Sequence, residues 1–391
     1  MSKIKDIEVF FLEYPFPKKL GYKYSGGLVE NMIVAIIKVT DSNDNYGIGE
    51  ITHGQFTHEP IIGLTKHFRD MLVGSDSHNI NQTWEKMYGS SVFWNREGIG
   101  IGVMGGINIA LYDLLGKNLK VPVYQLIGGL NKTKIRIYAS NGLFDNKDQL
   151  IEDARKAYNL GFRIYKMRVV EPSSIIELVH EFKKEFKDKM DLIVDAVQGS
   201  TSNPWATKVS INIAKKLEKY EVLFFEEPCR VENLDGYKEI KSNTNLNIAG
   251  AESIPTARAF KPYFENNVFD VVQFDIATSG FTEGRRIADM AYVYNKPVAI
   301  HSWGSAISIM AGIHFSLSIP NAAFTEYCFM DHPINQSLFE NETINISDGY
   351  VEPPETYGLG IKFDENLTKE FPYKEKINTM ILTDKEDIGL K

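Results

Sequence analysis

The chain is predicted to be an α/β protein in which a parallel β/α barrel is joined to an α+β capping domain. Eight short apolar runs begin 23 to 30 residues apart in the middle of the chain, and most intervals between them have a helical period. Eight strands with seven helical crossovers match a closed barrel, because open doubly wound sheets usually have about five or six strands. An antiparallel meander with helices precedes these runs and predicts the cap.

The capping domain is expected over residues 1–126. Three antiparallel strands are predicted at 4–14, 32–40 and 46–52, with a turn-forming stretch before the third. Helical periods follow at 59–73, 78–88 and 103–119. The glycines of a G-x-G-x-x-G pattern at 100–105 do not follow the first strand of a βαβ unit, so they do not predict nucleotide binding.

The barrel is expected over residues 127–329, as a (β/α)7β variant with a final strand. Its strands are predicted at 136–140, 163–168, 192–195, 222–226, 248–252, 271–275, 298–301 and 323–326. The remaining residues, 330–391, are turn-rich and too short for a domain, and we expect them to return to the cap.

Composition excludes several classes of protein. The 391 residues include 43 Lys and Arg against 51 Asp and Glu, a net charge of −8 that gives no attraction to nucleic acid. No uninterrupted apolar run reaches the length of about 18 residues that a membrane span needs, and the N-terminus lacks a signal-peptide core. The two cysteines cannot form a disulfide framework, so a cytoplasmic protein is expected.

Ionisable residues end seven consecutive barrel strands, at the face where barrel enzymes hold their active sites. In chain order they are Lys166 and Arg168, Asp195, Glu226, Glu252, Asp275, His301 and Glu326. Buried charges are costly unless they are paired or bind a metal, so a barrel has no structural need for this set. We therefore expect a catalytic site at this end.

Three carboxylates on adjacent strands, Asp195, Glu226 and Glu252, predict a cation site. Such groups repel one another strongly unless a cation lies among them, and oxygen ligands without Cys or His favour Mg²⁺ over Zn²⁺. The alternative is that each acid caps the helix that follows it. Asp275 and His301, also on neighbouring strands, predict a dyad in which the aspartate fixes the imidazole tautomer for proton transfer.

The remaining mouth residues have two interpretations each. Lys166 and Arg168 either pair with the acids or bind a substrate carboxylate, with Arg168 suited to bidentate contact. Glu326 either exchanges a proton across the site from Lys166 or is a structural carboxylate. Substrate contacts are also expected from Asn141 after the first barrel strand, and from the cap. The cap contacts are Lys23 and Tyr24 in the loop 17–31, which is expected to close over the mouth, and His53.

Nine stretches of the chain together form a recognisable pattern: YKMR at 165–168, IVDA at 193–196, FFEEP at 224–228, AGAES at 249–253, VVQFDIATSGFTEG at 271–284, PVAIHSWGSAIS at 297–308, FTEY at 324–327, IALYDLLGK at 109–117 and VYQLIGG at 123–129. In these stretches the chain resembles the enolase superfamily, in its mandelate racemase/muconate-lactonizing branch, and within it the acid-sugar dehydratases. The resemblance implies one Mg²⁺ per subunit, with Mn²⁺ as a substitute, on the three carboxylates. It also implies catalytic roles for His301, Asp275, Lys166 and Glu326, and a homo-oligomer such as an octamer.

Two departures from the family pattern bear on the reaction. Arg168 stands where a second, basic lysine is common, and Val197 stands where asparagine is common. Racemisation normally needs a base on each face of the carbon, and arginine stays protonated. His301 alone can remove an α-proton and then protonate a leaving hydroxyl in a syn elimination, whereas an anti elimination would need a second group, such as Lys166. The prediction is thus dehydration of an aldonate, such as gluconate, galactonate, arabinonate or xylonate, to a 2-keto-3-deoxy acid.

Three other functions stay open at this point. A racemase or epimerase on the same scaffold would exchange the α-proton without forming a keto acid. A glycosidase with a pair of barrel carboxylates would work without metal. A catalytically silent binding protein would bind metal without exchanging any α-proton.

Overall fold

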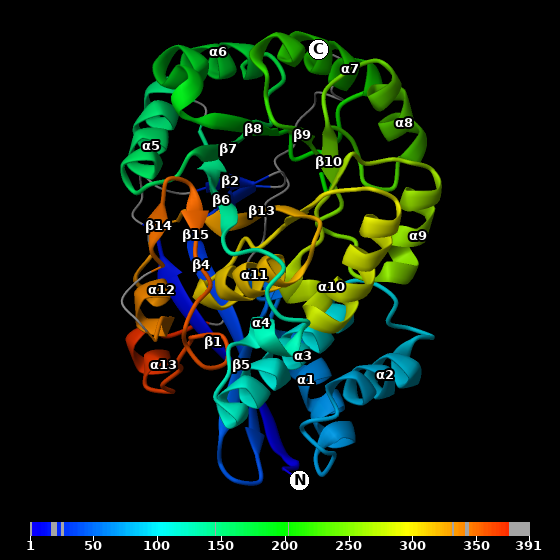
Figure 1. Ribbon diagram of the computed structural model, residues 1–391, viewed down its shortest axis with the longest axis vertical. Coiled ribbons are helices and arrows are strands. Elements are labelled where there is room, and N and C mark those ends of the chain that lie inside the picture. The colour runs from blue at the N-terminus through cyan, green and yellow to red at the C-terminus, as the bar shows by residue number, and fades with distance from the viewer. Residues whose placement is uncertain are drawn as a thin grey trace.

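The computed structural model describes residues 2–16, 22–24, 27–144, 146–201, 203–330, 332–340 and 344–374. At 22–24, 27–29, 142 and 143 the description covers the backbone alone. Within these residues the chain forms an N-terminal sheet with helices, a barrel ringed by helices, and a C-terminal segment (Figure 1).

Three antiparallel strands form the sheet of the cap. Their order is β1 (Ile4–Pro15), β4 (Asn31–Asp41) and β5 (Tyr46–Ile51). Apolar side chains of this sheet and of the following helices share one buried cluster. Those helices are α1 (Glu59–Leu72), α2 (Ile80–Ser91) and α3 (Ile99–Leu119). The predicted meander and its three helices are confirmed, but α3 begins at Ile99 rather than at residue 103, because glycines at 100 and 102 weaken the helical signal.

Glycines allow α3 to pack closely on its neighbours. A Cβ atom at Gly49 of β5 would lie 2.0 Å from the carbonyl oxygen of Gly106, and one at Gly105 would lie 2.2 Å from that of Thr278. The glycines at 100, 102 and 105 thus lie inside a tightly packed helix. In the described residues α3 is also the one helix long and apolar enough to cross a membrane, yet 83% of its apolar window is buried inside the structure.

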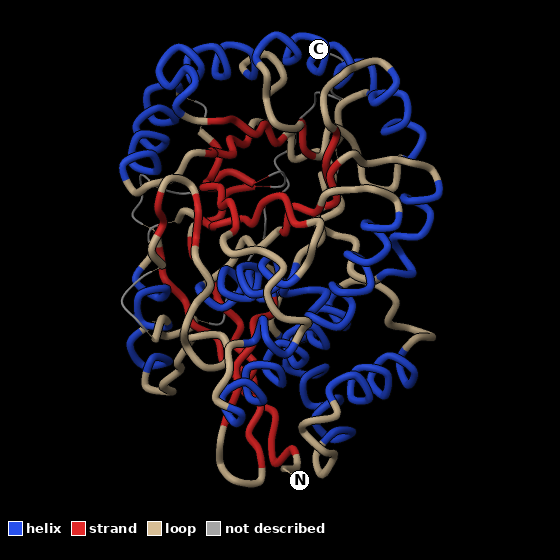
Figure 2. The backbone as a smooth tube through the Cα atoms, in the orientation of Figure 1, coloured by secondary structure: helices blue, strands red, loops and turns tan. Residues whose placement is uncertain are grey.

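Eight parallel strands close the barrel, which Figure 2 shows as a ring of strands. They are β6 (Ile135–Leu143), β7 (Ile164–Arg168), β8 (Asp191–Asp195), β9 (Phe225–Glu226), β10 (Ile248–Gly250), β11 (Val271–Val272), β12 (Val298–Ile300) and β13 (Ala322–Cys328). Each strand pairs with the next, and β13 pairs with β6. The predicted fold class is confirmed.

Helices surround the barrel on its outside. They are α5 (Lys147–Asn159), α6 (Ile175–Phe186), α7 (Thr207–Leu217), α8 (Leu234–Ser242), α9 (Ala257–Glu265), α10 (Ile276–Val293) and α11 (Ala306–Ser318). The short helix α4 (Val123–Leu126) lies against α3 and α11. Helices α10 and α11 lie between the barrel and the cap, where α10 contacts α3 and α11 contacts β5 (Figure 1). The strands that precede these two helices, β11 and β12, are therefore the part of the barrel nearest to the cap.

The C-terminal segment contacts both the barrel and the cap. It contains α12 (Pro333–Leu338), β14 (Ile346–Ser347), β15 (Tyr350–Val351) and α13 (Leu367–Glu370). Strand β15 pairs antiparallel with the start of β6. Towards the cap, the Tyr46 hydroxyl donates to the carbonyl oxygen of Phe363, and Glu365 forms an ion pair with Lys38.

Candidate active site in the barrel mouth

Alternation of side chains along the strands places a polar layer directly after an apolar one. The apolar layer is a buried cluster made by Tyr138, Ile164, Ile193, Phe224, Ala249, Val271 and Ala299. Two residues beyond Ile193 stands Asp195, and two residues beyond Phe224 stands Glu226. The apolar side chains close the barrel below the mouth, and the polar ones line the mouth itself.

Lys166 is fully buried among carboxylates. Its Nζ atom lies 2.7 Å from Glu226 Oε1, 2.9 Å from Glu326 Oε1 and 3.7 Å from Asp195 Oδ2. Burial alone would lower the pKa of Lys166, but Glu226 and Glu326 raise it well above its ordinary value. The structure therefore supports the pairing interpretation for this lysine.

Arg168 lies at the edge of the same cluster. Its Nε is 3.3 Å from Asp195 Oδ2, and its Nη1 donates to the carbonyl oxygen of Asn141 at 2.9 Å. Its guanidinium carbon lies 5.5 Å from the ring centre of Trp303, within the range of a cation–π contact. The side chain keeps 11% of its surface exposed, whereas Lys166 is fully buried.

The predicted dyad is assembled. His301 Nδ1 lies 2.8 Å from Asp275 Oδ2, and because a carboxylate only accepts, the imidazole carries its proton on Nδ1. The other oxygen of Asp275 accepts from the backbone N–H of Thr278 at 2.7 Å and from the Thr52 hydroxyl at 2.8 Å. Three donors fix this carboxylate, and Nε2 of His301 is the ring nitrogen that is turned to the mouth.

That Nε2 atom faces acidic side chains. It lies 3.2 Å from Glu252 Oε2 and 3.5 Å from Glu326 Oε2. Burial would lower the pKa of His301, but Glu326, Glu252 and Asp275 raise it to about 9. The arrangement makes His301 a strong proton acceptor inside the mouth.

Glu326 is fully buried and held in place on both oxygens. Oε2 accepts from the backbone N–H of Ser302 at 3.0 Å, and Oε1 contacts the Lys166 ammonium. Burial would raise the pKa of Glu326, but Lys166, His301 and Arg168 hold it well below its ordinary range. An ionised carboxylate here is a better partner for cations than a proton donor.

The three predicted metal ligands lie at the same mouth without surrounding one point. Asp195 and Glu226 are register partners on β8 and β9, and Glu252 follows β10. In the structure Lys166 contacts the first two, while Glu252 turns to His301. No group of three or more His, Cys, Asp or Glu side chains within the described ranges has the spacing of a metal site.

The donor chemistry nevertheless fits a divalent cation. The buried or half-buried acids of the mouth are Asp195, Glu226, Glu227, Glu252, Asp275 and Glu326, against the two permanent cations of Lys166 and Arg168. Burial raises the pKa of Glu226 to about 7 despite the Lys166 ammonium, and Asp195 and Glu326 add to this rise. One oxygen of Glu227 is buried with no described hydrogen-bond partner. This surplus of negative charge is what a hard cation would neutralise.

Backbone strain accompanies the predicted ligands. Val197, Glu227 and Ala251, each within two residues of one of them, have φ values of 52°, 42° and 89°. Positive φ is unfavourable for residues other than glycine, most of all for a β-branched one, and such residues cluster at functional sites. At Val197 the conformation lets its backbone N–H donate to Asp195 Oδ1 at 2.8 Å.

The other predicted substrate contacts differ in how they are placed. The Asn141 amide donates to Asp153 at 2.7 Å, so this side chain is engaged with α5. His53 lies in a short 3-10 helix, η1 (Thr52–Gln55), close enough to Gly102 that a Cβ there would meet its Nδ1 at 2.5 Å. Lys23 and Tyr24 lie on β2 (Tyr22–Tyr24), which pairs with β3 (Gly27–Val29) and, through Lys23, with Leu143 at the mouth end of β6. Their side chains are outside the described part of the structure.

Sequence reasoning missed Gln273. Its Nε2 donates to Glu226 Oε2 at 3.0 Å, and it is buried. It stands two residues before Asp275 and two after Val271 of the apolar layer, so the alternation of β11 could have revealed it. Thr52 and Trp303 were also missed. Strand alternation does not indicate either of them, because each contacts a residue of an element distant in the sequence.

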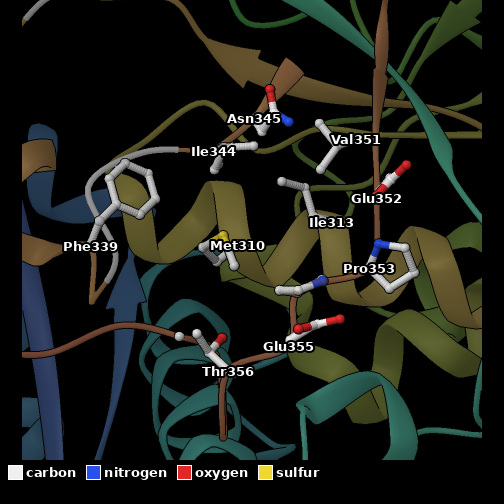
Figure 3. A pocket seen from close by; sticks show the side chains of 12 residues that line it. Met310, Ile313, Phe339, Ile344, Asn345, Val351, Glu352, Pro353, Glu355 and Thr356 are labelled. Carbon is white, nitrogen blue, oxygen red and sulfur yellow. The ribbon is translucent and has the colours of Figure 1, made fainter. Parts of the chain in front are cut away.

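A separate cavity of about 200 Å³ lies outside the barrel, between α11 and the C-terminal segment (Figure 3). Met310 and Ile313 of α11 face Phe339 and Val351 across it, with Glu352 at its edge. None of the predicted site residues lines it, so this cavity is distinct from the barrel mouth.

Comparisons with known proteins agree on one family. The model described as "Mandelate racemase / muconate lactonizing enzyme, N-terminal domain" matches residues 6–128, and "Enolase C-terminal domain-like" matches residues 149–367. An arabinonate dehydratase of Saccharolobus solfataricus is 27% identical over 355 residues, 89% of this chain and 93% of that protein. A D-galactonate dehydratase of Pectobacterium atrosepticum is 30% identical over 317 residues, 77% of this chain and 81% of that protein.

Among solved structures, the 3,6-anhydro-D-galactonate cycloisomerase from Zobellia galactanivorans superposes with a TM-score of 0.83. It is 28% identical, and the alignment covers 94% of this chain and 99% of that one. The similarity therefore extends over the cap, the barrel and the C-terminal segment together.

Proposed function

Because the chain belongs to the mandelate racemase/muconate-lactonizing branch of the enolase superfamily, we propose that it is a Mg²⁺-dependent sugar-acid dehydratase. Its substrate would be an aldonate such as arabinonate, galactonate, gluconate or xylonate, and its product a 2-keto-3-deoxy acid. The names of the two related dehydratases support this substrate class. The observation that carries the proposal is the His301–Asp275 pair, whose second imidazole nitrogen is directed toward the acidic side chains of the mouth.

Members of the enolase superfamily generally bind Mg²⁺, and in this chain Asp195, Glu226 and Glu252 would hold it. A divalent cation there would supply Lewis-acid stabilisation of the charge that develops on the substrate carboxylate when the α-proton leaves. Gln273 would orient Glu226 through its hydrogen bond, and the Val197 N–H would orient Asp195.

His301 would remove the α-proton through Nε2, with Asp275 stabilising the imidazolium that forms. The same imidazolium would then protonate the β-hydroxyl as it leaves on the same face, so that one residue serves as base and then as acid. Arg168 and Lys166 would bind the substrate carboxylate and secondary hydroxyls, and Glu326 would keep Lys166 in place. Asn141, His53, Lys23 and Tyr24 would contact the rest of the sugar chain.

Racemisation or epimerisation remains the alternative on this scaffold, and the described residues argue against it. Such a reaction needs a second base opposite His301. Lys166 is held by Glu226 and Glu326 at 2.7 and 2.9 Å, and Arg168 does not lose its proton. A single available base favours elimination.

A screen of aldonic and aldaric acids with Mg²⁺ in D₂O tests the proposal. Formation of a 2-keto-3-deoxy acid, confined to one stereochemical set and abolished by EDTA, is the expected result. Deuterium in recovered substrate without any keto acid would establish the racemase instead. Turnover of a glycoside in EDTA, or metal binding without exchange of any α-proton, would also reject the dehydratase.

A further inference from the structure

The capping domain reaches the dyad through the junction between the end of β5 and the first residue of η1. Two side chains separated by one residue do this: Thr52 donates to Asp275 Oδ1 at 2.8 Å, and Glu50 accepts from residues that follow His301. Both partners belong to the barrel, more than 200 residues away along the chain. The contact is between two parts of the fold that could otherwise shift relative to each other.

Glu50 fixes the loop between β12 and α11. Its carboxylate accepts from the Ser305 N–H at 3.0 Å, the Ser305 hydroxyl at 2.7 Å and the Ser308 N–H at 3.0 Å. It thereby satisfies N–H groups of the first turn of α11. Burial raises the pKa of Glu50 to about 7, although these hydrogen bonds from Ser305 and Ser308 act to lower it. Glu50 is 3% exposed, and a Cβ at Gly304 would lie 2.7 Å from its Oε1, so the loop is closely packed against it.

The same loop carries three groups of the mouth. His301 is its first residue, Ser302 donates its N–H to Glu326, and Trp303 lies against Arg168. A shift of this loop would therefore change the base and its two neighbours together. Glu50 holds the loop by its far end.

Thr52 acts on the other half of the dyad. Asp275 Oδ1 receives two hydrogen bonds, one from Thr278 of its own helix and one from Thr52 of the cap. The first is local, so, besides the bond to His301 itself, the hydroxyl of Thr52 is the described contact that ties the carboxylate to another element. Since Asp275 sets the tautomer and direction of the His301 ring, the orientation of the base depends on the cap.

We propose that the junction of β5 and η1 is a positioning element for the catalytic dyad, with Thr52 orienting Asp275 and Glu50 fixing the loop after His301. The cap would then determine the rate of proton transfer as well as the fit of the substrate. This inference rests on the proposed function for its kinetic consequence but not for its geometric one. Neither residue needs to touch the substrate.

The experiment compares Thr52→Val, which removes the hydroxyl at constant volume, with Thr52→Ser, which keeps it. Thr57→Val is the matched control, because Thr57 lies just beyond η1 and has no described side-chain hydrogen bond. Thr52→Val is expected to lower kcat about tenfold with KM unchanged, the effect of losing one hydrogen bond to a charged group. Thr52→Ser should restore most of the rate, and Thr57→Val should match the wild type. Glu50→Gln, folded by circular dichroism, should lower kcat in the same way.

A second readout needs no substrate. In protein labelled with ¹⁵N-histidine, the Nδ1–H resonance of His301, assigned by its loss in His301→Asn, should shift or broaden in Thr52→Val and return in Thr52→Ser. A shifted resonance in an enzyme that turns over no sugar acid would reject the proposed function and keep the positioning role. An unchanged resonance, an unchanged kcat, a rise in KM alone, or equal losses in Thr57→Val would overturn the positioning role.

Discussion

The two sides of the barrel mouth are organised differently. On the side of β11 and β12, Asp275 and His301 are in hydrogen-bonding contact. The other oxygen of Asp275 accepts from Thr278 and Thr52, and the loop after His301 is hydrogen-bonded to Glu50. On the side of β8 to β10, Asp195, Glu226 and Glu252 share the mouth without converging, and Lys166 lies between two of them. The difference follows from where the partners come from. Both members of the dyad have their hydrogen-bond partners within the chain. The carboxylates on adjacent strands repel one another, and Lys166 and Arg168 neutralise only part of their charge.

The largest effect is expected from His301→Asn, which changes the proton-transfer residue on the side of β11 and β12. The amide can keep a donor toward Asp275 near the position of Nδ1, but it is shorter than the ring and cannot take up a proton. We expect kcat to fall about 10²- to 10⁴-fold, the usual contribution of a general acid–base group, with little change in the melting temperature. Steady-state kinetics and α-proton exchange in D₂O measure the effect. Full turnover in this variant would show that the dyad is structural.

On the acidic side, Lys166→Met removes the ammonium from among its carboxylates. Leaving buried charges without their partner typically costs about 3–5 kcal/mol, so a loss of this size in the free energy of unfolding is expected in the absence of Mg²⁺. Added Mg²⁺ should recover part of the loss, because it would neutralise the same oxygens. Urea denaturation with and without the metal measures both quantities.

Lys238→Met is the control for that variant. Lys238 and Asp235 form an ion pair in which both side chains are exposed, so its removal should cost only about 0–1 kcal/mol. Equal costs for the two lysines would show that the buried cluster is not held together by Lys166.

The sequence predicted what depends on strand alternation and strand ends. Seven strands were expected to end in ionisable residues, and the structure brings those residues to one mouth. The eight barrel strands lie where the apolar runs were, although β9 and β11 are only two residues long. Gln273 follows the same alternation, but it was not predicted because it lies two residues before the end of its run.

What the sequence could not predict depends on contacts between distant elements. Thr52 reaches Asp275 across 223 residues, and Trp303 faces Arg168 from a loop without periodicity. The position of Lys166 among Glu226, Glu326 and Asp195 depends on carboxylates from three other strands, which residue identity alone does not place. Propensities and periods describe one element at a time, and these features belong to pairs of elements.

A buried histidine outside the mouth, His314, has surroundings that differ from those of His301. His314 of α11 accepts from the Tyr124 N–H through Nδ1 and contacts the Leu359 carbonyl through Nε2, and no described carboxylate contacts it. Burial lowers its pKa from 6.5 to about 4, whereas carboxylates raise that of His301. Because the unfolded chain binds this proton more readily, the contribution of His314 to stability is complete above pH 6.5 and is lost as the pH falls toward 4.

His314→Gln should therefore weaken the acid sensitivity of folding. Compared with the wild type, the variant should lose up to about 3 kcal/mol less between pH 6.5 and 4, the amount that corresponds to this shift. Chemical denaturation at a series of pH values measures the difference. The same substitution at the exposed His78 should leave the pH profile unchanged, and a profile unaltered by His314→Gln would mean that the buried ring is not the acid-sensitive group.

The smallest expected effect concerns the acidic side alone. If Asp195, Glu226 and Glu252 hold Mg²⁺ in the folded chain only, the metal at 100 times its dissociation constant should stabilise the protein by about 2.7 kcal/mol. Thermal unfolding at increasing Mg²⁺ measures this, and EDTA should reverse it and stop turnover. Glu226→Gln should abolish the stabilisation, because it removes a charge from the group whose repulsion the metal relieves. His301→Asn should retain it, because the dyad side is complete without a cation. A melting temperature insensitive to Mg²⁺ in the wild type, with activity that survives EDTA, would mean that Lys166 is the only cation the acidic side requires.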